Sequence, residues 1–335
     1  MSTPASRVAF GGLMRSKWIK LWSLRSTWWL YAITIVLFAG IAGLLALSSG
    51  DWTSSYLNPD NASFGSMAAE QIAQAKASAA ASAGAQVSQE WIRWDVPVLT
   101  FAQLVVSVLG VLGIAGEYQT GAIKSTFAAA PKRTAALFSK VLVIFLASVI
   151  IGAIGIAVAT ATSWGVLAAH GWPIDAGDPY VWRTLGGAIA YLGFAGAFGS
   201  LIGAIVRVQA GAIPTAIGFV LILPTIASLL AGMLDAAWLY NVGQFLPYSL
   251  GNDVSTYPFG EAANAAGGAS ASAGDVEGPW IDPVHDGFDP ATGQPDPSRD
   301  SGKISVGPAA AAVALAAWLV VGWVFAQLVT KRRDV

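Results

Sequence analysis

The sequence predicts an all-α integral membrane protein with six transmembrane helices and both termini on the cytoplasmic side. Three observations support this fold class: an apolar composition, six apolar segments of membrane-spanning length, and an uneven distribution of basic residues. Of the 335 residues, 55% are hydrophobic and 11% are charged, and the mean hydropathy is +0.60. A typical soluble domain has about a quarter of its residues charged. We therefore expect lipid to be the main solvent of the chain.

Six segments have roughly the 20 apolar residues that a helix needs to cross a hydrocarbon core about 30 Å thick. The expected spans are residues 27–48, 96–116, 140–163, 184–206, 210–233 and 306–329. None carries a charged residue well inside its apolar stretch. The second span is the least apolar, because Thr100, Gln103 and Ser107 dilute it. Pro214 and Pro224 lie in the fifth span and are expected to distort it, because proline removes backbone hydrogen bonds.

The first apolar segment follows several basic residues, as the apolar core of a secretory signal peptide does. It is longer than the roughly 7–15 apolar residues of such a peptide. No clear Ala-x-Ala cleavage site follows it. We expect residues 27–48 to be a retained span, with a cleaved signal peptide as the alternative.

The basic residues assign a side of the membrane to each connection. With the N-terminus inside, the cytoplasmic segments hold 13 of the 18 Lys and Arg residues and two of the 19 Asp and Glu residues. These segments are residues 1–26, 117–140, 207–209 and 330–335. The outer segments hold the remaining charged residues; they are 49–95, 164–183 and 234–305. Because cytoplasmic loops carry an excess of Lys and Arg, this distribution favours cytoplasmic N- and C-termini.

Further helices are expected outside the bilayer. In residues 6–25, apolar side chains such as Phe10, Trp18 and Leu21 recur at helical spacing, with Arg7, Lys17 and other basic residues at the edges. This pattern indicates an amphipathic helix on the anionic cytoplasmic leaflet; the alternative is a soluble extension bound to a partner protein. Residues 234–247 indicate an interfacial or re-entrant helix on the outer face, ended by Pro247. Residues 251–303 are expected to be flexible, because they contain few large apolar groups.

Sequence motifs for chemistry are missing. The chain has no cysteine and two histidines, and it lacks the phosphate-binding Gly-x-x-x-x-Gly-Lys-Ser/Thr motif, His-Glu-x-x-His and Gly-x-Ser-x-Gly. The spans hold no acidic pair or His-acid relay of the kind that proton-coupled carriers use. We expect no catalysis by this chain and no cofactor on it. Glycines repeat every three or four residues at Gly110, Gly113 and Gly116, and from Gly193 to Gly203, which indicates closely packed helices.

The most distinctive segment is the cytoplasmic connection after the second span, residues 117–139. Its features are a carboxylate where the helix leaves the membrane, a following aromatic residue and glycine, and a later group of basic residues. The residues of interest are Glu117, Tyr118, Gly121, Lys124, Pro131, Arg133 and Lys140. Spacing alone favours a simpler explanation, in which Glu117 caps a helix or is solvated and the basic residues only follow the positive-inside rule.

At these residues the chain resembles the membrane subunits of the ABC type-2 exporter family, especially actinobacterial permeases. The matching pattern is Glu117-Tyr118-x-x-Gly121, then Pro131-Lys132-Arg133, then Lys140 before the third span. The opening segment Lys17 to Trp29 and the sequence Phe245-Leu246-Pro247 also look typical of the family. The resemblance extends over the whole six-span layout, so that residues 1–335 would form one transmembrane domain.

The resemblance implies half of an ATP-driven exporter in the plasma membrane of a bacterium. A second copy or a paralogue would complete the translocation pathway. Separate ABC ATPase subunits would bind ATP and magnesium, and no nucleic acid would be involved. By the same analogy residues 117–139 would act as the coupling loop, with Glu117, Tyr118, Gly121, Lys124, Pro131, Arg133 and Lys140 as the residues that couple the chain to the ATPase.

Two other functions remain open from the sequence. One is an ATP-independent carrier, which the lack of ionisable residues inside the spans disfavours. The other is a non-transporting scaffold or immunity protein that acts through its outer loops, which the long segment 234–305 keeps open. A pathway lined by Gly, Ala, Phe and Trp would suit amphipathic or lipid-like cargo.

Overall fold

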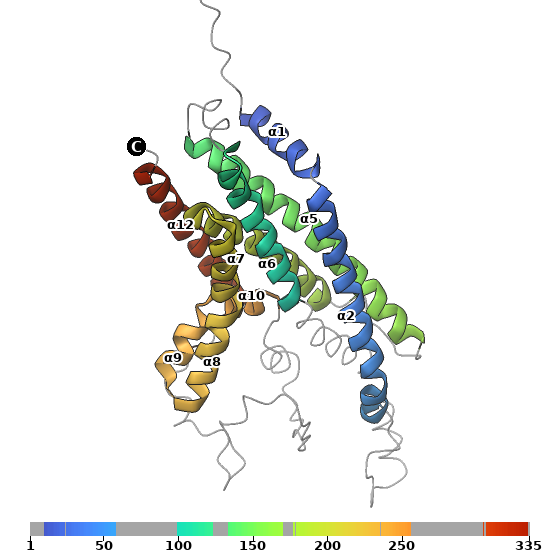
Figure 1. The fold of residues 1–335 in the computed structure, drawn as a ribbon. Helices are drawn as coiled ribbons and strands as arrows, with labels where there is room; N and C mark the ends of the chain where they lie inside the picture. Colours follow the sequence, from blue (N-terminus) through green and yellow to red (C-terminus); the bar gives the residue numbers. More distant parts are fainter. Residues whose placement is uncertain are drawn as a thin grey trace, which may run out of the picture.

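A computed structural model shows a bundle of long helices (Figure 1). It describes residues 10–23, 25–57, 99–122, 133–169, 177, 179–234, 236–255, 304 and 306–333, and this part of the chain contains no β-strand. The helices are α1 (Phe10–Ser23), α2 (Arg25–Leu57), the unlabelled helix Leu99–Gln119, α5 (Arg133–Ala169), α6 (Pro179–Val206), α7 (Gln209–Ile217), η1 (Gly218–Ile222), α8 (Leu223–Leu234), α9 (Ala237–Gln244), α10 (Pro247–Ser255) and α12 (Pro308–Arg333). The all-α prediction is confirmed for the described residues.

Five stretches of the described helices are long and apolar enough to cross a bilayer. They are Leu99–Gln119, Thr134–Ala169, Val181–Val206, Gln209–Leu234 and Pro308–Thr330. The first predicted span lies in α2, whose described apolar part, Tyr31–Leu47, is shorter than a full crossing. The first predicted span, and with it the total of six, therefore stays a prediction, as does the orientation of the bundle. Figure 1 shows α1 and the C-terminus at the same end of the molecule, as the prediction of two cytoplasmic termini requires.

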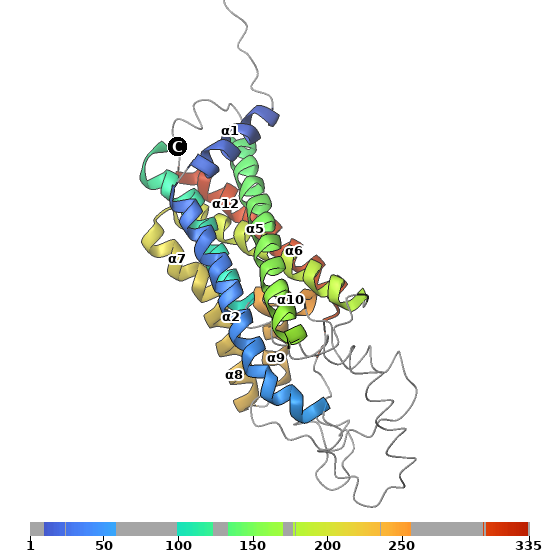
Figure 2. The ribbon, with the colours of Figure 1, turned by 90° about the vertical axis from the view of Figure 1, so that its right-hand side faces the viewer.

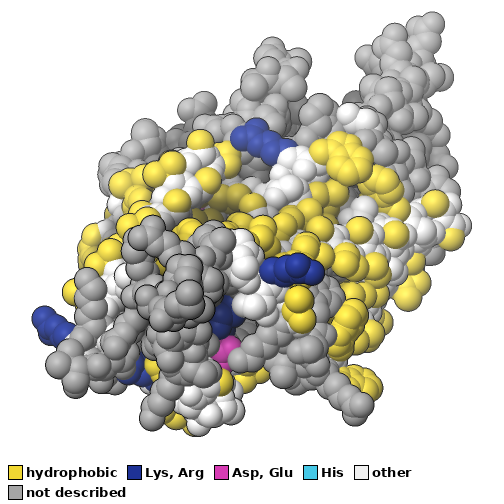
Figure 3. All heavy atoms as spheres, turned by 90° about the horizontal axis from the view of Figure 1, so that it is seen from above, with side chains coloured by type: hydrophobic (Ala, Val, Ile, Leu, Met, Phe, Trp, Pro, Cys, Tyr) yellow, Lys and Arg dark blue, Asp and Glu magenta, His cyan; other side chains and the backbone are white. Residues whose placement is uncertain are grey.

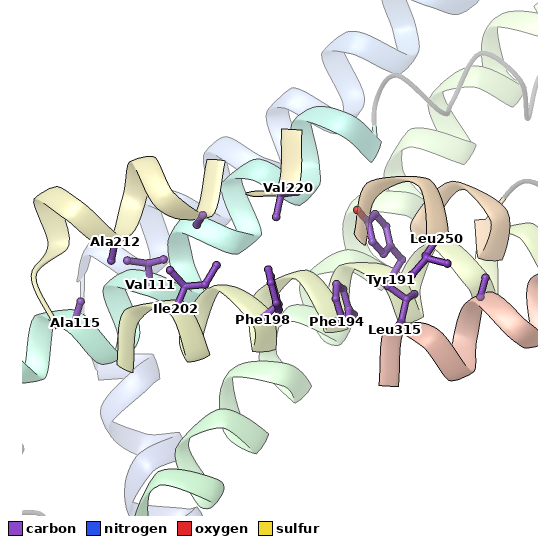
Figure 4. Packing of buried hydrophobic residues seen from close by; sticks show 12 residues of the cluster. Val111, Ala115, Tyr191, Phe194, Phe198, Ile202, Ala212, Val220, Leu250 and Leu315 are labelled. Carbon is purple, nitrogen blue, oxygen red and sulfur yellow. The ribbon is translucent and has the colours of Figure 1, made fainter. Parts of the chain in front are cut away.

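Helix α6 is the central element of the bundle. Every residue from 191 to 200 is buried, and the rings of Tyr191, Phe194 and Phe198 stack along one side of it. Figure 4 shows this row between Val111 of the Leu99–Gln119 helix and Leu250 of α10. Trp318 of α12 completes the cluster with its ring edge against Phe198.

Glycines bring α6 and the Leu99–Gln119 helix into backbone contact. A Cβ placed on Gly110 would lie 2.1 Å from the carbonyl oxygen of Gly196, and one on Gly199 would lie 2.2 Å from that of Ser107. No side chain fits at either position. We call these contacts the glycine seam; the sequence prediction that these small residues pack helices closely is confirmed.

The polar residues that dilute the second span fasten it to its neighbours. The Ser107 hydroxyl donates to the carbonyl of Ala195 at 3.3 Å. The Tyr191 hydroxyl donates to Oε1 of Gln103, which is fully buried. Thr100 and Tyr248 of α10 share a hydrogen bond of 3.3 Å. Each group would be costly to bury without such a partner.

The fifth predicted span consists of α7, a π-helical turn η1 and α8. The amide of Leu223 donates to the carbonyl of Gly218, five residues earlier. The next residue, Pro224, has no N–H and cannot form the usual bond to Val220. The distortion predicted from the prolines therefore takes the form of a π-turn.

The segment after this span, which the sequence predicts to lie on the outer face, forms two short helices where one was predicted. Helix α9 folds back beside α8, and α10 lies against α6 and α12 (Figures 1 and 2). Pro247 is the first residue of α10, a position where the missing N–H is harmless. Residues 251–255, which the sequence placed in the flexible segment, belong to α10. Residues 256–303 lie outside the described residues, as do 58–98 of the first outer loop.

Candidate functional site

A buried ion cluster lies at the end of the bundle that carries α1 and the C-terminus. Glu117, near the end of the Leu99–Gln119 helix, forms an ion pair through Oε2 with Nζ of Lys140 in α5. Nζ of Lys17 in α1 lies 4.0 Å from the same oxygen. Figure 3, which looks onto this end, shows acidic and basic side chains recessed among the surrounding atoms. Three separate helices therefore meet at one carboxylate.

The three side chains of the ion cluster are largely removed from water. The exposed fractions are 10% for Lys17, 11% for Glu117 and 9% for Lys140. Burying a charge costs several kcal/mol of free energy unless an opposite charge lies close by. Each charge therefore depends on the positions of the other two, and a displacement of one helix end changes the energy of all three.

Helix α1 contributes the third side chain of the ion cluster, Lys17. The sequence placed Lys17 at the edge of an apolar stripe on the lipid surface, but its side chain is turned inward to Glu117. Arg15 and Ile19, by contrast, are exposed. Because α1 packs on the first part of α5, Lys17 is at the right depth to approach the carboxylate.

Tyr118, the next residue along, contacts a different part of the bundle. The guanidinium carbon of Arg207 lies 4.8 Å from the centre of the Tyr118 ring, within the range of a cation–π interaction. Nη2 of Arg207 donates to the carbonyl oxygen of Val329 in α12 at 3.3 Å. Arg207 lies in the short connection between α6 and α7. Tyr118 is thereby linked to the second half of the bundle.

Gly121 ends the helix that carries Glu117 and Tyr118. Its φ of 70° is in the left-handed region, which glycine adopts without steric cost. The amide of Gly121 donates to the carbonyl of Tyr118 at 3.3 Å, and the amide of Thr120 donates to that of Gly116 at 3.0 Å. Glycine at this position is a common helix terminator, which explains the spacing Glu-Tyr-x-x-Gly in physical terms.

The structure brings together some of the residues that the sequence singled out. Glu117 and Lys140 are in contact, whereas Tyr118 and Gly121 adjoin them on the same helix end. Both Glu117 and Lys140 are helical, since the helix continues to Gln119 and α5 begins at Arg133. Lys124 and Pro131 lie outside the described residues, as does the side chain of Arg133.

Sequence reasoning missed two members of this region, Lys17 and Arg207. Arg207 was counted only as a cytoplasmic cation, and Lys17 was placed at the edge of the amphipathic helix and in the family-like opening segment, not against Glu117. Arg207 carried a signal, because it is the only charged residue between two long apolar segments that are almost continuous. Lys17 carried none, because Lys20 and Arg15 beside it are the same kind of residue.

The described residues define a multi-pass membrane protein with an ion cluster at one end of its bundle. A family model described as ABC-2 family transporter protein matches residues 20–335. The chain therefore belongs to the ABC-2 family of transporter proteins, and it is the permease subunit of an ABC transporter in the cell membrane. Members of this family are membrane subunits that are not themselves catalytic, and membership implies partnership with ABC ATPase subunits. No curated protein and no solved structure matches the chain.

Proposed function

We propose that this chain is the permease subunit of an ATP-driven exporter and is coupled to its ATPase through residues 117–139. Two copies, or this chain and a paralogue, form the translocation pathway. The ATPase subunits bind ATP and magnesium and contact the coupling segment on the cytoplasmic side. The residues proposed to carry the coupling are those of the family pattern, with Glu117 and Lys140 at its two ends.

The observation that supports this proposal is the ion cluster. Glu117 is at the start of the coupling segment, and its carboxylate is shared by lysines of α1 and α5. A force on the coupling segment would move Glu117 relative to Lys17 and Lys140. Because the three charges are buried, α1 and α5 would follow that motion rather than separate from it.

The test compares Glu117→Gln with a matched control, Gln119→Ala. Both positions lie at the end of the same helix, but Gln119 is exposed. The complex with its ATPase is purified and reconstituted in proteoliposomes, and transport is measured per ATP hydrolysed. A coupling free energy of about 1–3 kcal/mol corresponds to a loss of roughly 5–150-fold. We expect this loss for Glu117→Gln and none for Gln119→Ala.

A charge exchange, Glu117→Lys with Lys140→Glu, sharpens the test. It keeps the ion pair between positions 117 and 140 but places a lysine beside Lys17, so we expect it to recover only part of the lost coupling. The proposal fails if Glu117→Gln transports as much per ATP as the native protein. Transport by the chain alone, driven by an ion gradient with every ATPase removed, would favour the ATP-independent carrier instead.

A further inference from the structure

We propose that Arg207 is a positioning residue that carries the motion of the coupling segment to α12 and to the fifth span. This inference rests on the proposed function and extends it from the first half of the bundle to the second. It starts from two contacts that the Arg207 side chain makes, one with the Tyr118 ring and one with the Val329 carbonyl.

The backbone of Arg207 is in a conformation that arginine rarely adopts. Its φ is 66°, and it is the only residue other than glycine with a positive φ in the described part of the chain. Glycine would form this turn without strain. The turn itself therefore does not require an arginine, and we attribute the arginine to the contacts that its side chain makes.

The guanidinium group joins three elements at once. The backbone of Arg207 connects α6 to α7, its Nη2 donates to the last turns of α12, and its guanidinium carbon lies over the Tyr118 ring. A cation is favourable near the C-terminal end of a helix such as α12, where the backbone dipole is negative. The planar guanidinium can stack and donate at the same time, which the compact ammonium of a lysine cannot do.

Glu117 and Tyr118 contact different parts of the bundle, so a movement of the coupling segment would reach both. Adjacent residues on an α-helix point about 100° apart. Glu117 faces the lysines of α1 and α5, whereas Tyr118 faces Arg207. The same helix end also lies close to α7, since a Cβ on Gly116 would be 2.9 Å from Nε2 of Gln209. One displacement of this end would thus move both halves of the bundle.

The discriminating variant is Arg207→Gly. It relieves the backbone strain and removes the side chain, so that a residue needed only for the turn would be replaced without loss. Gln119→Ala is the matched control, because Gln119 lies at the same helix end as Tyr118 but is exposed. Arg207→Lys keeps the charge, and we expect it to recover coupling only in part.

The experiment uses the full complex with its ATPase in lipid nanodiscs. Spin labels are placed at Thr134→Cys in α5 and Arg332→Cys in α12, which are both exposed, in a chain that has no native cysteine. The distance between the labels is measured without nucleotide and with ATP and vanadate, alongside transport per ATP. We expect the distance to change in the native chain and in Gln119→Ala. In Arg207→Gly we expect the same thermal midpoint, no distance change, and transport per ATP lowered roughly 5–150-fold.

Each outcome decides between the proposals. A native distance change and native transport per ATP in Arg207→Gly would overturn the role of Arg207 and leave the proposed function intact. If the native chain shows neither an ATP-dependent distance change nor ATP-dependent transport, the proposed function fails and this inference falls with it. If Arg207→Gly does not fold, Tyr118→Leu decides, because it removes the ring that Arg207 covers: a native response there overturns the inference, and a lost response supports it.

Discussion

The glycine seam allows a prediction whose size follows from the structure. In Gly199→Ala the new Cβ would lie 2.2 Å from the carbonyl oxygen of Ser107 and 2.8 Å from its carbonyl carbon. These atoms are backbone, so no side-chain rotation can relieve the clash. The Leu99–Gln119 helix and α6 must move apart, which also loosens the seam at Gly110 and Gly196. Overpacking of this kind typically costs about 1–3 kcal/mol of stability.

A second alanine variant isolates this cost. Gly186 lies on the same helix, and a Cβ there would meet no atom within 4 Å. Any gain from replacing glycine by alanine inside a helix, roughly 0.5–1 kcal/mol, is common to both variants and cancels in the comparison. Gly199→Ala should therefore be less stable than Gly186→Ala by about 1–3 kcal/mol.

The assay is equilibrium unfolding of the purified chain in mixed detergent micelles, with helix content as the readout. Gly110→Ala serves as a replicate, because its Cβ would meet the carbonyl of Gly196 at 2.1 Å. Equal midpoints for Gly199→Ala and Gly186→Ala would show that the two helices do not approach as closely as described. The account of α6 as the rigid centre of the bundle would then be wrong.

Three other predictions follow from the charged and exposed residues. Lys140→Met should lower the free energy of unfolding by about 3 kcal/mol, because Glu117 loses its nearer partner. Removing all three charges, by Lys140→Met with Glu117→Leu and Lys17→Met, should recover most of this loss; equal stability of the single variant and the native chain would contradict this. Burial raises the pKa of Asp253 from 3.8 to about 6, so the ionised carboxylate is disfavoured in the folded state. The stability of the native chain relative to Asp253→Asn should therefore fall as the pH rises from 3.8 to about 6, and it should stay constant at higher pH. An impermeant maleimide should modify Met233→Cys on intact cells, since Met233 is 81% exposed, but it should modify Thr134→Cys only after the cells are permeabilised. The reverse labelling pattern would show that the predicted orientation is wrong.

Most of the helical architecture could be predicted from the sequence, because lipid imposes a simple rule. A backbone in hydrocarbon must satisfy its own hydrogen bonds, so an apolar run of sufficient length is a helix. The glycine repeats predicted close packing for the same reason, since only small residues let backbones touch. The π-turn at Gly218–Ile222 and the separate helix α10 were not predicted. The π-turn follows from the missing N–H of Pro224, whereas the placement of α10 depends on its tertiary contacts with α6 and α12.

The candidate site could be predicted only in part. Glu117 stood out because it is an acidic residue among cytoplasmic cations, and Lys140 followed from the resemblance to the family. Lys17 is separated from Glu117 by 100 positions in the sequence, and its partner depends on the angle at which α1 crosses α5. The positive-inside rule explains cytoplasmic cations as a group, so it hides those that are individually buried. Arg207 was not predicted as part of the site for the same reason.

The polar residues of the second span give the bundle a way to convey motion across the membrane. Thr100, Gln103 and Ser107 weaken this segment as a hydrophobic span, yet the structure pairs each of them with α6 or α10. Together with the glycine seam, these bonds prevent the helix from sliding along α6. A displacement at Glu117 would then be passed along a rigid rod of about 25 Å, at 1.5 Å per residue, to the contact between Thr100 and Tyr248. We therefore expect α10, at the other end of the Leu99–Gln119 helix, to respond to events at the ion cluster.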